Sequence, residues 1–358
     1  ARIFLPRMQQ SRQYLEGWAS AALSRPVSFD SLTARWRGME PVFQFDGVII
    51  HSPNKHSSQL AIHQLDISIS WWQSLLNMRL VPGHVEVIGT KFHIQQLSLN
   101  KYLVNNVPVD LSVGDAKTNA SDFSWLFHTG FYLSDSNVYL QDMHGNHLHL
   151  SPVELAVKSD GDVDQIAGLI TFKQTIASTV RFSLHIDTNE LKQNKLRMRA
   201  YAAGEEVSLL QWQNFLQKWI PLHEKVRGGK ADVQLWLDVD DNKVKSVASE
   251  ISLHYFGLQG WHLRQRVFFP NVRVNCSWSA LSNGWIFNVS KLHAHLPGLD
   301  WPDNTFSWQQ QNSSTGHRTS TINIGFLRLQ DLPLIERQLD GIPLKLRTWY
   351  NRFSPYGD

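Results

Sequence analysis

Residues 230–258, KADVQLWLDVDDNKVKSVASEISLHYFGL, contain the pattern that decides the fold. From Ala231 to Val239 every second residue is apolar, and the residues between them are mostly polar. A period of two is typical of a β-strand that buries one face and keeps the other in water. Residues 240–242, Asp-Asp-Asn, favour a tight turn because these side chains bond their own backbone and tolerate left-handed φ. The alternation resumes at Ile251, so the stretch predicts an antiparallel hairpin with one apolar and one polar face.

Strand patterns of this kind recur through most of the chain, and turn signals separate them. A change of phase at residues 30–31 predicts a β-bulge, and Asn283-Gly284 predicts a hairpin turn. We therefore predict a mainly β fold, an elongated and twisted antiparallel sheet. Besides the opening hairpin, its strands are expected at 27–37, 41–50, 60–69, 85–94, 132–141, 147–157, 166–172, 180–186, 272–278, 285–292 and 321–329.

Helical patterns are few and short by comparison. Residues 6–24 have apolar side chains at helical spacing and Pro6 in the first turn, which predicts an amphipathic helix. A short helix followed by Gly and a strand occurs twice, about fifty residues apart, within the range of repeat architectures. Further helices are predicted at 71–78, from 121 onward, at 209–219 and at 332–339, with a helix or an extended run at 344–353.

Composition excludes several classes of function. Charged residues are 18% of the 358, and the formal net charge is only +3. Nucleic-acid binding would require a concentrated basic stripe beside stacking aromatic residues, and the Lys and Arg residues are spread thinly. Cys276 is the single cysteine, so an internal disulfide is impossible. We expect no nucleic-acid partner.

The ends of the chain suggest a piece of a longer protein. The sequence begins at Ala1 rather than at Met, and residues 354–358 stop where another strand would begin. No run approaches the roughly 18 apolar residues that a membrane span needs.

No group of residues encodes catalysis. The densest polar cluster is Asp142, His144, His147 and His149, where a metal site is conceivable. A polar hairpin tip at residues 145–146 is the favoured interpretation, because nothing supplies a second shell of partners. His293 and His295 are likewise expected to face solvent. We expect no enzyme activity, catalytic residue, metal or cofactor, since nucleophile-elbow, phosphate-loop and zinc-helix motifs are all missing.

A succession of short motifs resembles a known family. PVSF (26–29), WRG (36–38) and FDGV (45–48) are followed by GKADVQLWL (229–237), NGWIF (283–287), WP (301–302), the run 329–339 and PYG (355–357). The first three resemble the N-terminal region of AsmA-like envelope proteins. The later motifs resemble the YhdP branch of that family, and they occur in the expected order.

The resemblance implies a lipid-transfer function. It implies a periplasmic β-sheet curled into a groove, attached to the inner membrane by a missing N-terminal helix, which passes phospholipid between the inner and outer membranes. Residues 1–26 would be an amphipathic helix after the anchor. Residues 27–202 and 203–358 would be two β-groove segments, the second continuing into a missing C-terminal part. Contacts with the outer membrane or with envelope proteins stay open.

The predicted strands are compatible with such a groove because the predicted helices are too few to cover their apolar faces. Acyl chains would then lie on an apolar lining. Three alternatives remain. The two halves of the sheet could close on one another as a sandwich core, or the chain could be an envelope scaffold that binds protein partners through strand edges. An enzyme acting on envelope glycans would need a carboxylate pair in a cleft, and the carboxylates lie mostly in predicted turns. The predicted lining includes Val233, Leu235, Leu237, Ile251, Leu253 and Tyr255.

Overall fold

The computed structural model describes Glu16 and residues 26–51, 60–110, 130–172, 178–216, 225–259, 267–312 and 317–328, with short gaps inside these ranges. The gaps are 39, 77, 79–81, 99–100, 106, 146, 161–162, 188, 191–194, 297–298 and 327. Glu16 is helical, and the rest of the helix predicted at 6–24 lies outside the described residues, as do the helices predicted from 121 and from 332 onward.

The chain is mainly β and divides into two compact units. Unit 1 comprises Ala1–Ala177 with Arg181–Met198, and unit 2 comprises Ser178–Val180 with Arg199–Asp358.

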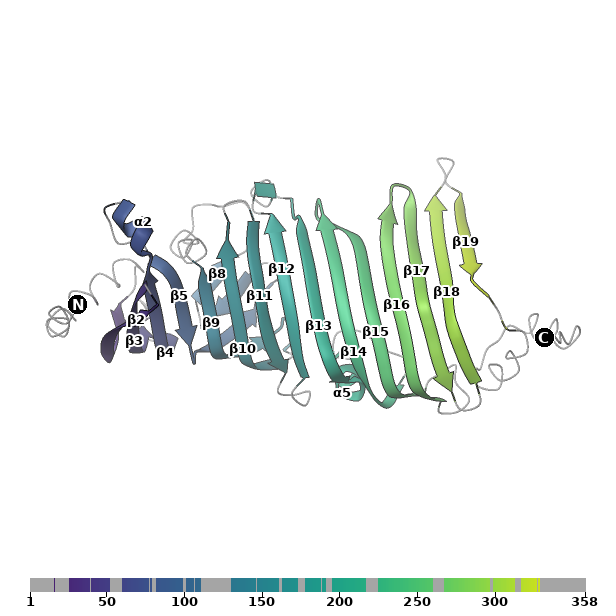
Figure 1. The fold of residues 1–358 in the computed structure, drawn as a ribbon, viewed down its shortest axis with the longest axis horizontal. Helices are drawn as coiled ribbons and strands as arrows, with labels where there is room; N and C mark the ends of the chain where they lie inside the picture. The colour runs from purple at the N-terminus through teal and green to yellow at the C-terminus, as the bar shows by residue number, and fades with distance from the viewer. Residues whose placement is uncertain are drawn as a thin grey trace, which may run out of the picture. The chain divides into compact units, whose positions relative to one another are not determined.

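Unit 1 contains short and medium strands and the helix α2 (Trp71–Leu76), which connects β4 to β5 (Figure 1). The strands are β1 (Val27–Ser28), β2 (Ser31–Arg37), β3 (Glu40–Ile50), β4 (Leu60–Ile69), β5 (Pro82–Ile88), β6 (Lys91–Gln96), β7 (Lys101–Val104), β8 (Val107–Asp110), β9 (Phe131–Gln141), β10 (His147–Ser159), β11 (Val163–Phe172) and most of β12 (Ser178–Asp187).

The sheet of unit 1 is mixed, which corrects the prediction of a wholly antiparallel sheet. Strands β2, β3, β4 and β5 pair antiparallel in chain order. Strand β9 then pairs parallel to both β5 and β6, and its first half lies beside β5. The parallel pairs arise because β9, which follows β8 in the chain, lies beside β5 and β6 and runs in the same direction as both. Beyond them, β9, β10 and β11 continue antiparallel.

One face of unit 1 forms a buried core. Cross-strand partners share a face of a sheet, and the register places Leu32, Phe45, Leu65, Val87 and Leu133 in one row across five strands. Val87 and Leu133 are buried, and the other three pack against the buried cluster. That cluster consists of Val27, Phe29, Val48, Ile62, Val87, Leu133, Val138, Leu150 and Val153.

Unit 2 is a meander of long strands that lie side by side in chain order (Figure 1). After β13 (Met198–Ser208) comes the helix α5 (Leu209–Leu216), which lies against β14. The Val226 N–H donates to Oε1 of the buried Gln213 in this helix at 2.8 Å. The remaining strands are β14 (Lys225–Asp240), β15 (Lys243–Gln259), β16 (Val267–Leu281), β17 (Gly284–Leu296), β18 (Leu299–Asn312) and β19 (Arg318–Ile324).

Local sequence signals positioned most of these elements correctly. Asp241 and Asn242 adopt φ of 51° and 62°, so the two-residue turn between β14 and β15 is confirmed. The predicted turn at 283–284 is also confirmed, and Gly284 opens β17, where a Cβ would lie 1.9 Å from the Gln310 carbonyl oxygen. The helices predicted at 71–78 and 209–219 are confirmed as α2 and α5 within the described residues. Residues 29–30 interrupt the strand predicted at 27–37, one residue before the predicted bulge.

The sheet of unit 2 is open, which corrects the predicted curl. The described pairings run from β14 to β19 one neighbour at a time, and none of them joins β14 to β19. Figure 1 shows these strands as a gently twisted sheet. Residues 225–324 therefore form an open face rather than a strongly curled groove.

Candidate functional site

The register of unit 2 sorts its side chains onto two chemically distinct faces. Opposite residues on neighbouring antiparallel strands point to the same side, so each row across the sheet can be followed from strand to strand. We call the first side the apolar face. Its central row runs from Leu237 on β14 to Ile322 on β19, and every member is hydrophobic. The members are Leu237, Val247, Trp278, Phe287, Trp308 and Ile322.

Neighbouring rows extend the apolar face toward the other end of β14. One runs Leu235, Ser249, Cys276, Val289, Phe306 and Ile324; another runs Ala231, Leu253, Val272, Ala294 and Trp301. Val233, Ile251 and Val274 lie between them. Ser249 is the single polar member of these rows. Four successive rows thus make a continuous hydrophobic surface.

The opposite side of the same strands is the polar face. A representative row contains Gln234, Glu250, Asn275 and Ser290. Its side chains bond to one another across strands; for example, Nδ2 of Asn275 donates to Oε1 of Glu250 at 3.4 Å. Because these groups pair or face water, the polar face leaves no need for a second layer.

The apolar face lacks the covering that a folded core would give it. Leu235 is 44% exposed, Trp308 40% and Ile322 57%. Among the described residues of β14 to β19, the buried hydrophobic side chains are Ala231 and Val239 alone. A sandwich would bury the rows almost completely, so the sandwich alternative does not describe this part of unit 2. Exposed apolar area on this scale marks a binding surface.

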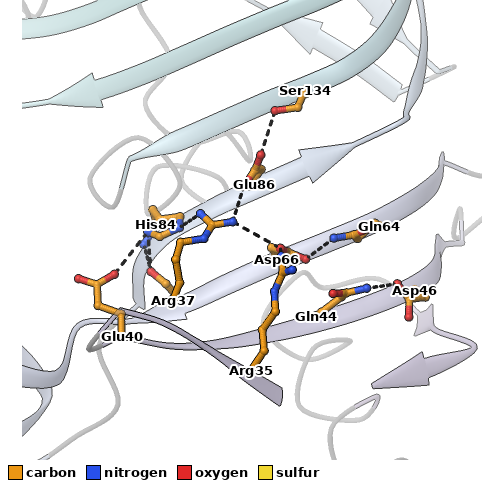
Figure 2. Close-up of polar contacts among 11 residues, drawn as sticks. Arg35, Arg37, Glu40, Gln44, Asp46, Gln64, Asp66, His84, Glu86 and Ser134 are labelled. Atoms are coloured by element: carbon orange, nitrogen blue, oxygen red, sulfur yellow. Dashed lines mark hydrogen bonds and ion pairs between the residues drawn. The ribbon is translucent and has the colours of Figure 1, made fainter. Parts of the chain in front are cut away.

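Unit 1 carries a second candidate, a polar network on the side of its sheet opposite the core (Figure 2). At its centre is the fully buried carboxylate of Asp66 on β4. The guanidinium of Arg35 donates to Oδ2, and Nη2 of Arg37 lies 3.9 Å from the same oxygen. Gln64 donates to Oδ1 at 2.8 Å. Glu86 lies directly opposite Asp66 on β5.

The rest of the network ties down the neighbouring groups. Nη2 of Arg37 lies 3.3 Å from Oε2 of Glu86. The other carboxylate oxygen of Glu86, Oε1, accepts a hydrogen bond of 3.0 Å from the Ser134 hydroxyl. His84 lies 2.7 Å from the Ser68 hydroxyl through Nδ1. Two adjacent carboxylates are what a glycan hydrolase requires, but here arginine side chains occupy the oxygens of both. The network therefore fits a clamp between β2, β4, β5 and β9 better than a catalytic pair.

Comparison with known proteins identifies the family of the chain. The model of the YhdP protein family matches the chain over residues 1–358. The chain belongs to the YhdP family. It is 21% identical over 316 residues to the intermembrane phospholipid transporter YhdP of Escherichia coli strain K12. That match covers 86% of this chain and 23% of the relative, so the chain spans less than a quarter of that protein. No solved structure matches.

For this YhdP-family chain, the predicted lining residues lie together except at one end. Val233, Leu235, Leu237, Ile251 and Leu253 occupy adjacent rows of the apolar face. Tyr255 lies where β14 and β15 change register, with φ of 52° and 72% exposure. Its ring centroid is 6.4 Å from that of Phe268. The role of all six as a lining remains a prediction.

Sequence reasoning missed the larger part of the apolar face, on β16 to β19. Strands were predicted at the positions of β16, β17 and β19 but not at β18 (Leu299–Asn312), and the faces of the predicted strands could not be matched to β14. The signal that would have found them is the aromatic content: Trp285 and Trp308, for instance, pack edge to face at 5.1 Å between centroids. The missed members are Trp278, Trp285, Phe287, Val289, Phe306, Trp308, Ile322 and Ile324.

The single thiol lies within the apolar face. Burial raises the pKa of Cys276, and its hydrogen bond with Ser249 offsets this only in part. A thiol with a raised pKa stays protonated near neutral pH and is a weak nucleophile. Cys276 therefore contributes to the face as a small hydrophobic side chain.

The candidate metal ligands are placed by local contacts. The His144 N–H donates to Oδ1 of Asp142 at 3.0 Å, the geometry of a turn between β9 and β10. His293 and His295 share the polar face and lie 3.6 and 3.4 Å from Asp300. Within the part of the chain that the structure describes, no three His, Cys, Asp or Glu residues form a metal site, and no helix has the length and hydrophobicity to cross a bilayer.

Proposed function

We propose that the apolar face of unit 2 carries the acyl chains of phospholipid. In this proposal the chain is the periplasmic part of an envelope transporter that moves phospholipid between the inner and outer membranes. The observation that supports it is the half-exposed apolar face, continuous over six strands and opposed by a polar face. Family membership and the name of the E. coli relative supply the substrate class.

The dimensions of the apolar face suit an acyl layer. From Ala231 to Val239 the face extends about 27 Å along β14 at about 3.4 Å per residue. The hydrocarbon of one leaflet is about 15 Å deep, half of a bilayer core of about 30 Å. Each methylene removed from water contributes about 0.8 kcal/mol. Acyl chains can therefore be held by contact area alone, without a polar group that recognises one headgroup.

The proposal assigns the six predicted residues to the lining and gives none of them a chemical role. Val233, Leu235, Leu237, Ile251 and Leu253 would contact acyl chains directly, with Tyr255 at the edge. Attachment to the inner membrane through an upstream helix is part of the same proposal. The scaffold alternative has one observation in its favour: all seven residues of β19 are exposed, and β18 is its partner among the described strands.

Mass spectrometry of organic extracts from the purified 358-residue chain tests the proposal. We expect stoichiometric phospholipid with the wild type and a several-fold loss of it with Leu235→Asp. The matched control is Trp236→Asp, the adjacent residue on the polar face, which is 38% exposed. It introduces the same charge on the same strand and should retain the lipid.

Two outcomes would contradict the proposal. A well-folded wild type without extractable lipid would show that the apolar face is not loaded. Equal lipid in Leu235→Asp and Trp236→Asp would show that the lipid lies elsewhere. A co-purifying protein in place of lipid would favour the scaffold alternative.

A further inference from the structure

The connection between β4 and β5 exposes large apolar side chains that the proposed transport path does not use. Helix α2 exposes Trp71, Trp72, Leu75 and Leu76 by 57, 74, 59 and 81%, and Met78 just after it by 92%. A single exposed apolar residue is ordinary, but five within eight positions are not. This group is called the α2 tip.

Helix α2 turns its apolar side outward. At about 100° per residue, its four exposed side chains fall within a sector of about 140°. Ser74 lies outside that sector and is half-buried, and its N–H donates to the Ser70 carbonyl oxygen at 2.9 Å. A helix on the surface of a globular protein normally shows water its polar side. The orientation of α2 is therefore the reverse of that of an ordinary surface helix.

The end of the unit 1 sheet beside α2 adds one exposed tryptophan, Trp36, whereas Ile69 in the same row is buried. Val42 pairs with Ser68, so the next row contains Pro41 and Ile69, with Trp36 opposite Pro41 on β2. Trp36 is 60% exposed. The row belongs to the apolar side of the sheet, two residues along from the pair Phe43 and Ile67. The α2 tip therefore stands at the end where the apolar side of unit 1 begins.

We propose that the α2 tip inserts into the interface of a phospholipid bilayer. Two tryptophans beside leucines are the composition of interfacial segments, since the indole ring is apolar yet donates a hydrogen bond at the headgroup level. Interfacial helices lie in the plane of the membrane with their apolar side buried about 5–10 Å, and the four exposed side chains of α2 lie on one side of the helix, as this orientation requires. The choice of a bilayer as partner rests on the proposed function.

This inference adds to the proposed function a place where the chain meets its membrane. A bilayer at the α2 tip would lie next to the first apolar rows of unit 1. The exposed Trp36 at the end of those rows would then lie close to the membrane surface.

Flotation of the 358-residue chain with vesicles of mixed phosphatidylethanolamine and phosphatidylglycerol tests the proposal. Burying one large apolar side chain corresponds to about a tenfold gain in partitioning. The double substitution Trp71→Ser and Trp72→Ser should therefore lower vesicle binding about a hundredfold. Both side chains are exposed, so folding should be unaffected. Met143→Ser, which removes a 47% exposed side chain from the turn between β9 and β10, should bind as the wild type does.

A site-specific probe makes the test independent of overall affinity. In a Cys276→Ser background, Leu76→Cys labelled with an environment-sensitive fluorophore should shift to the blue when vesicles are added. Met143→Cys with the same label should not. An unchanged emission spectrum of the label at position 76 would overturn the proposal. A spectral shift caused by a protein partner but not by vesicles would overturn it as well.

The two proposals fail separately in these experiments. If α2 docks on membranes, the Trp71→Ser and Trp72→Ser variant keeps its extractable lipid and loses flotation. Leu235→Asp should show the reverse. Equal flotation of the wild type and the α2 variant would overturn the α2 proposal and leave the apolar face of unit 2 untouched.

Discussion

Units 1 and 2 are built from the same alternating strands, yet only unit 1 turns its apolar side into a core. In unit 1 the row through Val87 and Leu133 packs into a buried cluster. In unit 2 the row through Leu237 and Trp308 remains half-exposed. Alternation therefore fixes which side of a strand is apolar, whereas the covering of that side depends on the rest of the fold. Residues with the same local pattern stabilise a buried core in unit 1 and form a half-exposed surface in unit 2.

The largest expected difference between the units concerns truncation of one leucine. Leu133→Ala should lower the free energy of unfolding by about 2–5 kcal/mol, because Leu133 is 6% exposed and the change opens a cavity in the core. Leu235→Ala in unit 2 should cost only about 1 kcal/mol, since Leu235 is half-exposed already. Denaturant titration of each variant measures both. Equal losses would show that the apolar face of unit 2 is covered in solution.

A smaller difference is expected for the acidic residues on the polar side of each unit. Asp66→Asn should cost about 2 kcal/mol, because the buried carboxylate accepts charge-assisted hydrogen bonds from the Arg35 guanidinium. Asp232→Asn in unit 2 should change stability by no more than about 1 kcal/mol, since its contact with His254 at 3.1 Å is exposed. The same denaturant titration compares them. A larger loss for Asp232→Asn would refute the clamp assigned to the unit 1 network.

The smallest effect concerns acid, and here the two units should agree. Hydrogen bonds from Gln44 and Ser31 lower the pKa of Asp46 below 3.8, and the Glu206 N–H lowers the pKa of Asp232 in the same way. The folded state then holds these protons less tightly than the unfolded state. The resulting stabilisation is present above about pH 4 and is lost as the pH falls through the lowered values.

Thermal unfolding between pH 5 and pH 2 measures this contribution, since the relevant change lies below the ordinary carboxyl pKa of about 4. Asp46→Asn and Asp232→Asn should each flatten the acid side of the stability curve, because each variant lacks at neutral pH the small stabilisation that the wild type loses in acid. A steeper acid side in either variant would contradict the direction of the pKa shift.

The sequence carried enough information for single hairpins but not for whole rows. The turn at 241–242 and the faces of β14 and β15 follow from local residue types. In β17, a bulge at Lys291, whose φ is 51°, moves the apolar side from Ala294 to Val289 and Phe287. Apolar side chains on this face occupy an even-numbered position on one side of the bulge and odd-numbered positions on the other side. No residue type at the bulge predicts this change. This is why the predicted lining ended at β15.

Two other features, the parallel strand pairs and the exposure of α2, could not be predicted from local sequence patterns. The parallel pairs of β9 with β5 and β6 join segments far apart in the chain, and such pairing depends on long-range packing rather than on alternation. The exposure of α2 was equally hidden, because a short apolar helix is normally assigned to a core. The start of α2 at Trp71 was predicted correctly from the sequence. Which side of the helix faces outward is seen only in the folded structure.

The meander of unit 2 has a consequence for how such proteins change in length. Each strand contributes one residue to every row of the apolar face, and neighbouring strands lie about 4.8 Å apart. Gain or loss of one hairpin would therefore lengthen or shorten the hydrophobic surface by about 10 Å while leaving its chemistry unchanged. The number of hairpins therefore sets the length of the hydrophobic surface without any change in the residue types that form it.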